Sequence, residues 1–311
     1  SATNANDFFI VKLNASGDKL WEHAFGTRVY EDLTDLRQTG DGGFVLAGES
    51  DRDLWVVRID AEGNKLWDRT FGGSEYDGEC RIRVLSDGGF ILGAVTFSDV
   101  SGNKSTPLQG DYDYWILRLD ADGNKLWEHD FGGSHIDYFS DVHVTLDGGF
   151  VVAGFGYSEP DGNKTAPRRG DGYDLWLVRL DNAGNKIWDE TYDGIHRLGI
   201  PRIQPTRDGG LMMAGSFATY TNIPIQDVII FKLSADAFTA PQLRFPSINQ
   251  TPGAFRFQLS GISNRTYVTE FSTDSQAWVP LATNHLVSES VEIVDSQLEV
   301  LQRFYRARMV E

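Results

Sequence analysis

The chain has 311 residues, with 28 lysines and arginines against 45 aspartates and glutamates, and a formal net charge of −17. This acidity argues against nucleic acid or an anionic membrane surface as the main partner. No apolar run approaches the ~20 residues of a membrane-spanning helix, so no membrane insertion is predicted. A single cysteine, Cys80, excludes an intramolecular disulfide framework and a cysteine-based zinc site.

A four-fold internal repeat organises residues 7–233. An Asp-Gly-Gly turn followed by an apolar run recurs four times, and a tryptophan keeps step with it at intervals of 46, 60 and 61 residues. The second glycines of the turns are Gly43, Gly89, Gly149 and Gly210, and the tryptophans are Trp21, Trp67, Trp127 and Trp188. Because the glycines and the tryptophans recur at the same three intervals, the segment consists of copies of one duplicated unit. These glycines and tryptophans are therefore predicted to be structural.

Each unit is predicted to contain four antiparallel strands, called a to d. In one copy they cover about 77–85, 89–94, 114–119 and 125–131. Along the chain the strand types run cd, abcd, abcd, abcd, abc. Four-stranded units of ~45 residues without helices indicate a β-propeller, since packing the sheets around an axis buries their faces. We therefore predict an all-β fold, with a β-propeller of about five (four to five) four-stranded blades over residues 1–239.

The repeat resembles the Trp…Phe-Gly-Gly-Ser…Asp-Gly-Gly-Phe propeller repeats of secreted and surface proteins from bacteria. Residues 71–74 and 131–134, both Phe-Gly-Gly-Ser, match it most fully, whereas Phe25-Gly26-Thr27 departs from it. The resemblance implies a scaffold or interaction module that is extracellular or at the cell surface. It brings no catalytic residues with it.

Residues 240–311 lack both the repeat and its acidity, with six arginines, no lysine and seven acidic residues. Alternating runs such as 255–259, 267–271 and 291–293 indicate half-buried strands. The phrase from Tyr267 to Ala282, with residues 303–307, resembles C-terminal β-sandwich modules of large extracellular bacterial proteins. We predict a second domain over 240–311, a small immunoglobulin- or fibronectin-like β-sandwich.

Two long connections between strands b and c, within 98–115 and 158–176, hold the candidate binding residues. They are duplicates of each other, belong to adjacent blades, and are predicted to leave from the end that also carries the d–a connections, forming one ledge. Tyrosines there would stack on a sugar ring, and carboxylates would bind hydroxyls or a hard cation. The alternative is a self-capped loop whose side chains bond local backbone amides. The candidate residues are Asp111, Tyr112, Asp113, Arg168, Arg169, Asp171, Tyr173 and Asp174.

Two acids form the candidate metal site. Asp77 and Asp137 stand ten residues after Trp67 and Trp127, on the same predicted end, and Glu31 takes that position in the first copy. A ring of carboxylates near a channel mouth would bind a cation such as calcium, and no other cofactor is predicted. The alternative is that each acid holds a neighbouring loop by accepting backbone N–H bonds.

Basic residues recur on strand c between apolar neighbours, as Arg58, Arg118 and Arg179 with Lys12 and Lys232. We interpret them as a repeated salt bridge or a solvent-facing row rather than an anion site.

For catalysis the sequence offers little. Its six histidines show no metal-binding spacing, and no nucleophile elbow or glycine-rich phosphate loop is present. The sequence thus favours a non-enzymatic interaction or scaffold protein that binds a glycan or a surface protein through the loop-rich face. Self-association through open strand edges is a further prediction. The alternative is a polysaccharide-active enzyme, a lyase or glycoside hydrolase, using the same face.

Overall fold

The computed structural model describes residues 6–27, 29–145, 148–169, 172–195, 202–206, 210–219, 225–233, 243–244, 255–260, 265–272, 276–286, 290–295 and 304–310. The regular structure in these residues is β-strand, and none of them forms a helix long and apolar enough to cross a membrane. The chain divides into two compact units, residues 1–165 with 180–187 and residues 166–179 with 188–311. Each unit is described by itself.

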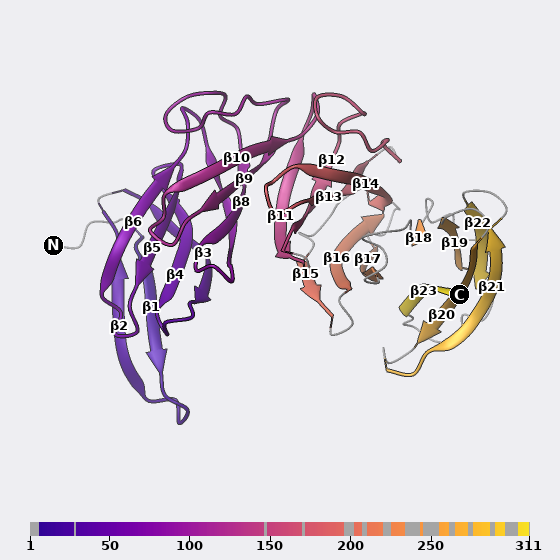
Figure 1. Ribbon diagram of the computed structural model, residues 1–311, viewed down its shortest axis with the longest axis horizontal. Coiled ribbons are helices and arrows are strands. Elements are labelled where there is room, and N and C mark those ends of the chain that lie inside the picture. The colour runs from indigo at the N-terminus through magenta and orange to yellow at the C-terminus, as the bar shows by residue number, and fades with distance from the viewer. Residues whose placement is uncertain are drawn as a thin grey trace. The chain divides into compact units, whose positions relative to one another are not determined.

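The repeat region contains seventeen strands among the described residues (Figure 1). They are β1 (Phe8–Leu13), β2 (Lys19–Phe25), β3 (Glu31–Gln38), β4 (Phe44–Ser50), β5 (Asp53–Ile59), β6 (Lys65–Phe71), β7 (Asp77–Val84), β8 (Phe90–Thr96), β9 (Asp113–Leu119), β10 (Lys125–Phe131), β11 (Asp137–Val144), β12 (Phe150–Gly156), β13 (Tyr173–Leu180), β14 (Lys186–Ile195), β15 (Arg202–Pro205), β16 (Leu211–Thr219) and β17 (Ile225–Leu233).

These strands form five antiparallel sheets in chain order. Their hydrogen-bonded orders are β1-β2, β3-β4-β5-β6, β10-β9-β8-β7, β11-β12-β13-β14 and β15-β16-β17. In the a-to-d notation this is cd, abcd, abcd, abcd, abc, so the predicted strand order is confirmed. The fold is all-β and of the β-propeller class.

The C-terminal strands form two three-stranded sheets, β18-β19-β22 and β21-β20-β23. Leu259, Tyr267 and Ile293, which come from both sheets, share one buried apolar cluster. The predicted domain boundary at 239 falls on residues outside the described ranges and stays a prediction. The strands are β18 (Leu243–Arg244), β19 (Phe255–Ser260), β20 (Arg265–Ser272), β21 (Val279–Leu286), β22 (Ser290–Asp295) and β23 (Phe304–Val310).

In the first unit, the long connections leave from one end of the sheets. Strand pairing puts Asp77 opposite Thr96, and Thr96 opposite Asp113. In the following sheet Asp137 is opposite Gly156. The connections after Thr96 and Gly156 therefore leave from the end at which β7 and β11 begin. We call this the loop end, and the opposite end, with the Asp-Gly-Gly turns, the turn end.

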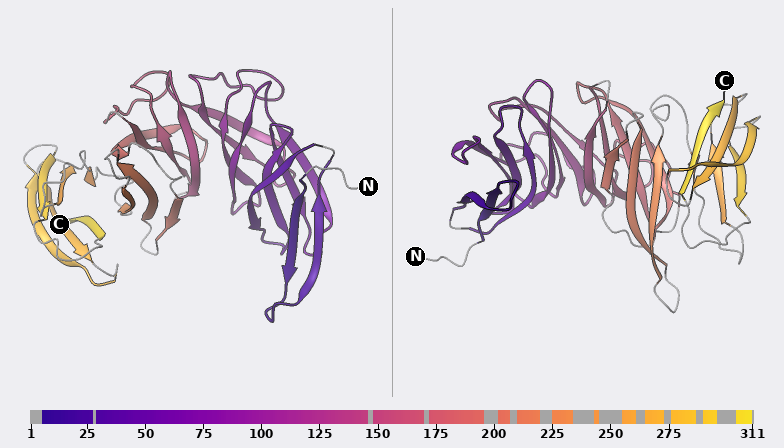
Figure 2. Two further views of the ribbon diagram at one scale, coloured as in Figure 1. Left: turned by 180° about the vertical axis from the view of Figure 1, so that it is seen from behind. Right: turned by 90° about the horizontal axis from the view of Figure 1, so that it is seen from below.

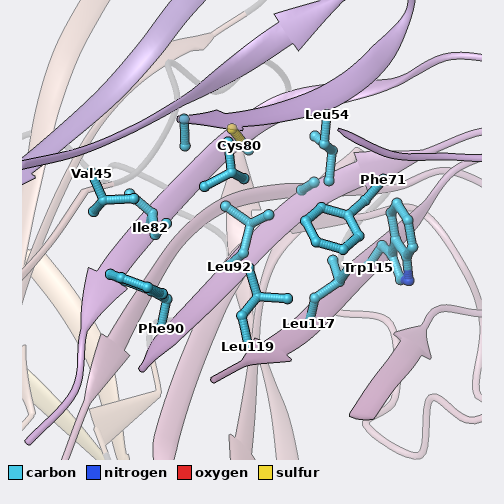
Figure 3. Close-up of a cluster of buried hydrophobic side chains, with 13 residues drawn as sticks. Val45, Leu54, Phe71, Cys80, Ile82, Phe90, Leu92, Trp115, Leu117 and Leu119 are labelled. Carbon is cyan, nitrogen blue, oxygen red and sulfur yellow. The ribbon is translucent and has the colours of Figure 1, made fainter. Parts of the chain in front are cut away.

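Apolar side chains pack between successive sheets of the first unit (Figure 3). Strands b and c supply most of them, because each complete sheet there has a neighbour on both faces and must be apolar on both. The cluster between β3–β6 and β7–β10 includes Val45, Leu54, Leu92, Trp115, Leu117 and Leu119, all fully buried.

The four repeat tryptophans lie on the d strands β2, β6, β10 and β14. The indole N–H of Trp21 donates to the carbonyl oxygen of Ala61 at 3.2 Å, and that of Trp67 donates to Ala121 at the same distance. Both acceptors lie in the c–d turn of the next sheet. These two tryptophans therefore tie one sheet to the next.

The second glycine of the Asp-Gly-Gly turn makes room for the strand-c arginine. A Cβ at Gly43 would collide with the guanidinium of Arg58, and one at Gly89 with that of Arg118. The arginine crosses the turn because it pairs with the turn's own aspartate: Nη2 of Arg58 lies 2.6 Å from Oδ2 of Asp41. In these two sheets the strand-c arginines thus form a repeated salt bridge.

Candidate functional site

At the loop end, the strands of type a in the first unit, β3, β7 and β11, each begin with a buried acid. Asp77 accepts hydrogen bonds from the backbone N–H of Gly73 at 2.7 Å and from the hydroxyl of Ser98 at 2.8 Å. Asp137 makes the same pair of bonds in the next sheet, each at 2.7 Å. Glu31, their counterpart in the first copy, is equally buried. The acids of the candidate metal site therefore hold the adjoining loops.

These acids do not gather into a cation-binding group. Over the described residues, no cluster of three or more His, Cys, Asp or Glu side chains is placed to hold a metal ion. Burial raises the pKa of Asp137 to about 6, against the lowering effect of its bonds from Gly133 and Ser158. Calcium dependence stays a prediction.

The first long connection, residues 97–112, is fastened to two sheets. The side-chain amide of Asn103 accepts from the N–H of Gly72 at 3.0 Å and donates to the carbonyl of Thr70 at 2.8 Å, both in the preceding sheet. The ammonium of Lys104 lies 2.5 Å from Oδ2 of Asp130 in its own sheet, and both side chains are fully buried. The connection is thus a clamp between neighbouring sheets.

The three candidates in this connection lie at different depths. Asp111 is exposed, and Tyr112 is half-buried, with its ring stacked on Phe97 at a centroid distance of 3.9 Å. Asp113 is fully buried; its Oδ2 accepts from the N–H of Gln109 at 2.5 Å, and its Oδ1 has no hydrogen-bond partner. Asp111 and Tyr112 are therefore accessible, whereas Asp113 supports the loop from inside.

The buried carboxyl of Asp113 predicts a pH effect on stability. Burial raises its pKa to about 8, so the folded chain binds this proton more tightly than the unfolded chain does. Stability from this group is therefore present at low pH and is lost as pH rises towards 8. Asp113→Asn, which cannot titrate, is expected to flatten the fall in unfolding free energy between about pH 4 and 8.

Urea unfolding across this pH range checks the prediction. Asp99→Asn is the matched control, because hydrogen bonds from the backbone of Val100 and Leu108 lower the pKa of that exposed carboxyl. An Asp113→Asn chain that loses stability with pH as steeply as the Asp99→Asn chain would contradict this account.

The candidates of the second connection lie in the second unit. The backbone N–H of Arg169 donates to Oδ2 of the buried Asp174 at 2.6 Å, Arg168 and Tyr173 are half-buried, and Asp171 lies outside the described residues. Because the two connections are divided between the units, the single ledge that would join them stays a prediction.

A cluster of aromatic rings and carboxylates gathers at the loop end, next to Tyr112. We call it the tyrosine–glutamate cluster; its members are Glu49, Tyr76, Glu79, Phe97, Tyr112 and Tyr138. All six side chains are half-buried, so each keeps some contact with solvent. The cluster draws on three successive sheets and on the first long connection.

Hydrogen bonds order the polar part of this cluster. Oε1 of Glu49 accepts from the hydroxyl of Tyr76 at 2.5 Å and from the backbone N–H of Glu79 at 2.8 Å. The hydroxyl of Tyr138 bonds the side chain of Glu79. Burial, followed by these bonds to glutamate, raises the pKa of both tyrosines, which therefore stay neutral donors.

The backbone at Glu79 is unusual for a strand. Its φ is +52°, in the left-handed region that residues other than glycine rarely adopt, and the register of β7 shifts between Gly78 and Arg81. Such bulges re-aim a side chain, and strained residues concentrate where a protein binds or reacts. Here the bulge brings Glu79 to Glu49 and Tyr138.

Sequence reasoning missed most of this cluster. It singled out Tyr112, but not the glutamates or Tyr138. A signal was present in the repeat: Glu49 stands where the next two copies have Val95 and Phe155 and the fourth has Ser216. A charge at a position where no other copy carries one marks a departure from packing.

A cavity of 480 Å³ lies at the turn end of the first unit. Its lining includes Asp41, Arg58, Leu66 and Trp67 from one sheet and Leu85 from the next. Asp41 and Arg58 form the repeated salt bridge, and Trp67 ties its sheet to the next one. We therefore interpret the cavity as a gap between adjoining turns. It is at the opposite end from the tyrosine–glutamate cluster.

No protein-family model and no curated protein matches this chain. Solved structures that resemble it include the WD40 domain of Neurospora crassa Pan2 at 11% identity and a TM-score of 0.38, an ACO/RPE65 chimera at 14% and 0.40, and a glycoside hydrolase at 11% and 0.29. The matches cover 78%, 90% and 92% of this chain, but only 65%, 66% and 68% of the other chains. With such low TM-scores, these likenesses support no inference about activity or ligand.

Proposed function

We propose that this protein is a non-enzymatic, extracellular or cell-surface interaction protein that binds a glycan at the loop end of its propeller sheets. The binding site is the tyrosine–glutamate cluster, with Asp111 beside it. The C-terminal sheets form a β-sandwich that spaces or anchors the propeller. The observation that carries this proposal is the arrangement of partly exposed tyrosine rings around two carboxylates.

The chemistry of the cluster supports a glycan over other ligands. Aromatic rings give flat apolar surfaces for the C–H faces of a sugar, and carboxylate oxygens accept hydrogen bonds from its hydroxyls. The net charge of −17 disfavours an acidic polysaccharide, so the preferred ligand is a neutral one.

The fastening of the first long connection also supports binding. Lys104 and Asn103 hold the connection to two sheets, so the cluster is ordered before a ligand arrives. A site ordered in advance loses less entropy on binding, which raises its affinity.

Glycan-array screening of the full chain, followed by calorimetric titration with the best oligosaccharide, tests the proposal. Tyr138→Ala and Glu79→Gln are each expected to weaken binding about tenfold or more, since about 1.4 kcal/mol of lost contact is tenfold in affinity. Tyr30→Ala, which removes an exposed tyrosine outside the cluster, should bind as the wild type does. Absence of binding to any glycan would overturn the proposal, and so would equal binding by all three variants.

The alternative of a polysaccharide-active enzyme is tested with the same preparation. Turnover of neutral and acidic polysaccharides, with and without calcium, would replace binding by catalysis as the function. We then expect Glu49→Gln or Glu79→Gln to abolish turnover, because the two carboxylates of the cluster would have to act on the sugar.

A further inference from the structure

Most hydrogen-bond donors of the tyrosine–glutamate cluster are engaged within the protein. The hydroxyl of Tyr76 and the backbone N–H of Glu79 both donate to Oε1 of Glu49, at 2.5 Å and 2.8 Å. The hydroxyl of Tyr138 bonds the side chain of Glu79. The hydroxyl of Tyr112 donates to none of the described residues. Over the described residues, the cluster therefore keeps a single spare donor among its side chains.

The acceptors of the cluster, in contrast, are only partly used. An ionised carboxylate accepts hydrogen bonds at about four positions on its two oxygens. Oε2 of the half-buried Glu49 accepts from no described residue and keeps contact with solvent. The bonds from Tyr76, Tyr138 and the backbone of Glu79 thus leave most acceptor positions of the two glutamates open.

The two glutamates lie close together although they come from different sheets. Glu49 is on β4 and Glu79 is on β7, and Figure 2 shows their sheets following one another in the first unit. The bond from the backbone of Glu79 to Oε1 of Glu49 brings these acids next to each other. Neighbouring hydroxyls of one sugar unit can therefore contact both carboxylates.

The rings of the cluster contribute contact area but little discrimination. The ring of Tyr112 is stacked on Phe97 at a centroid distance of 3.9 Å, and that of Tyr138 on Phe155 at 5.0 Å, with an angle of 5° between the planes. One face of each tyrosine is thus covered by the protein. The remaining ring surface is apolar and contacts a methylated sugar as well as a free one. Selectivity therefore has to come from the glutamates.

We propose that the cluster selects its glycan by free hydroxyls, so that its ligand is a neutral glycan with unsubstituted hydroxyls and O-methylated or O-acetylated chains are rejected. The inference rests on the proposed function and names the glycan class for the same site. Substitution removes the hydrogen that a carboxylate accepts and brings a further acceptor to a site with few donors. Glu49 or Glu79 would then lose hydration without gaining a bond, which is costly for a charged group.

Calorimetric titration of the full chain with pairs of oligosaccharides tests the inference. The probes are neutral hexasaccharides of glucose, mannose, galactose and xylose, in α- and β-linked forms, each with free hydroxyls and as its per-O-methyl derivative. We expect the per-O-methyl form of any hexasaccharide that binds to bind about tenfold more weakly or worse, because a hydrogen bond to a charged group contributes at least that factor. These pairs test the wild-type chain and depend on no variant.

A pair of variants locates the selectivity in the cluster. Glu79→Gln puts an amide N–H donor in place of an acceptor, so the affinity ratio of free to methylated sugar should fall about threefold or more. The backbone N–H of Glu79 still bonds Glu49 in this variant, and circular dichroism should show that it folds. Glu75→Gln is the matched control, because Glu75 is exposed, pairs with Arg52 and lies outside the cluster. It should keep the wild-type ratio.

The outcomes separate this inference from the proposed function. Methylated sugars that bind as tightly as free ones, or more tightly, would show that the rings govern selection, which overturns the inference and leaves glycan binding intact. The same holds if Glu79→Gln and Glu75→Gln have equal ratios. Binding of none of the hexasaccharides in either form would overturn the inference together with the proposed function.

Discussion

Replacing Lys104 by alanine is expected to lower the free energy of unfolding by about 3–5 kcal/mol, because it leaves a buried carboxylate without its cation. The ammonium of Lys104 lies 2.5 Å from Oδ2 of Asp130 and 2.5 Å from the carbonyl oxygen of Thr106, and both charged side chains are fully buried. After the substitution Asp130 keeps the bond from the hydroxyl of Thr106 at 2.7 Å, but no ion pair.

The loss should depend on pH. Burial raises the pKa of Asp130 to about 7 even though Lys104 lowers it, and removing the cation raises it further. A protonated Asp130 needs no cation, so the deficit of Lys104→Ala should be smaller near pH 5 than near pH 8.

Urea unfolding measures this effect. Lys65→Ala is the control: its ion pair with Asp68 is 3.0 Å long but exposed, and its loss should cost about 0–1 kcal/mol. Equal losses in the two variants would mean that the first long connection is not fastened in solution.

Replacing Arg83 by leucine is the second large expected effect, again about 3–5 kcal/mol. Arg83 on β7 bridges two acids on neighbouring a strands, with Nη1 at 2.9 Å from Oδ2 of Asp35 on β3 and Nη2 paired with Asp141 on β11. Arg37 also pairs with Asp35, so Asp35 keeps one cation after the substitution. The expected loss of stability therefore measures how strongly Arg83 links the three sheets that contain β3, β7 and β11.

The variant Arg83→Leu/Asp141→Asn is designed to separate charge from packing. If the charge of Asp141 contributes to the loss, the added Asp141→Asn change should recover part of it. Arg52→Ala, which removes an exposed pair with Glu75, should change stability by less than about 1 kcal/mol. A loss in Arg83→Leu no larger than in Arg52→Ala would contradict the bridge.

The strand order could be predicted from the sequence because the pattern of each strand type occurs in several copies of the repeat. The Asp-Gly-Gly turn, the apolar run of strand c and the tryptophan of strand d fix the hairpins by local chemistry, and the register follows from the turns. The tail could be predicted only as alternating runs, because no second copy exists there to compare.

The tyrosine–glutamate cluster could not be predicted because its members are brought together by pairing between sheets. Glu49, Glu79 and Tyr138 belong to three different copies of the repeat. Their contacts depend on a bulge in β7, and no glycine or other turn residue in the sequence indicates that bulge at Glu79. The burial of Asp113 could not be predicted for a related reason. The sequence shows that an acid stands at the end of a loop, but not that the loop covers it.

The long connections have a clearer structural role than the sequence suggested. Asn103 bonds Gly72 and Thr70 of the preceding sheet and Lys104 pairs with Asp130, so these bonds fasten the first connection to its neighbours rather than to its own backbone amides, as the self-capped alternative had it. The loop-end acids Asp77 and Asp137 serve the same purpose. The binding that we propose therefore involves the rings and carboxylates that this fastening holds in place.

The central claim is that ligand binds at the loop end, and hydrogen–deuterium exchange with a bound oligosaccharide tests it most directly. We predict slower exchange in residues 76–80, 97–112 and 136–139, with no change in the turns at 39–43 and 85–89. Protection confined to those turns, beside the 480 Å³ cavity, would contradict the claim.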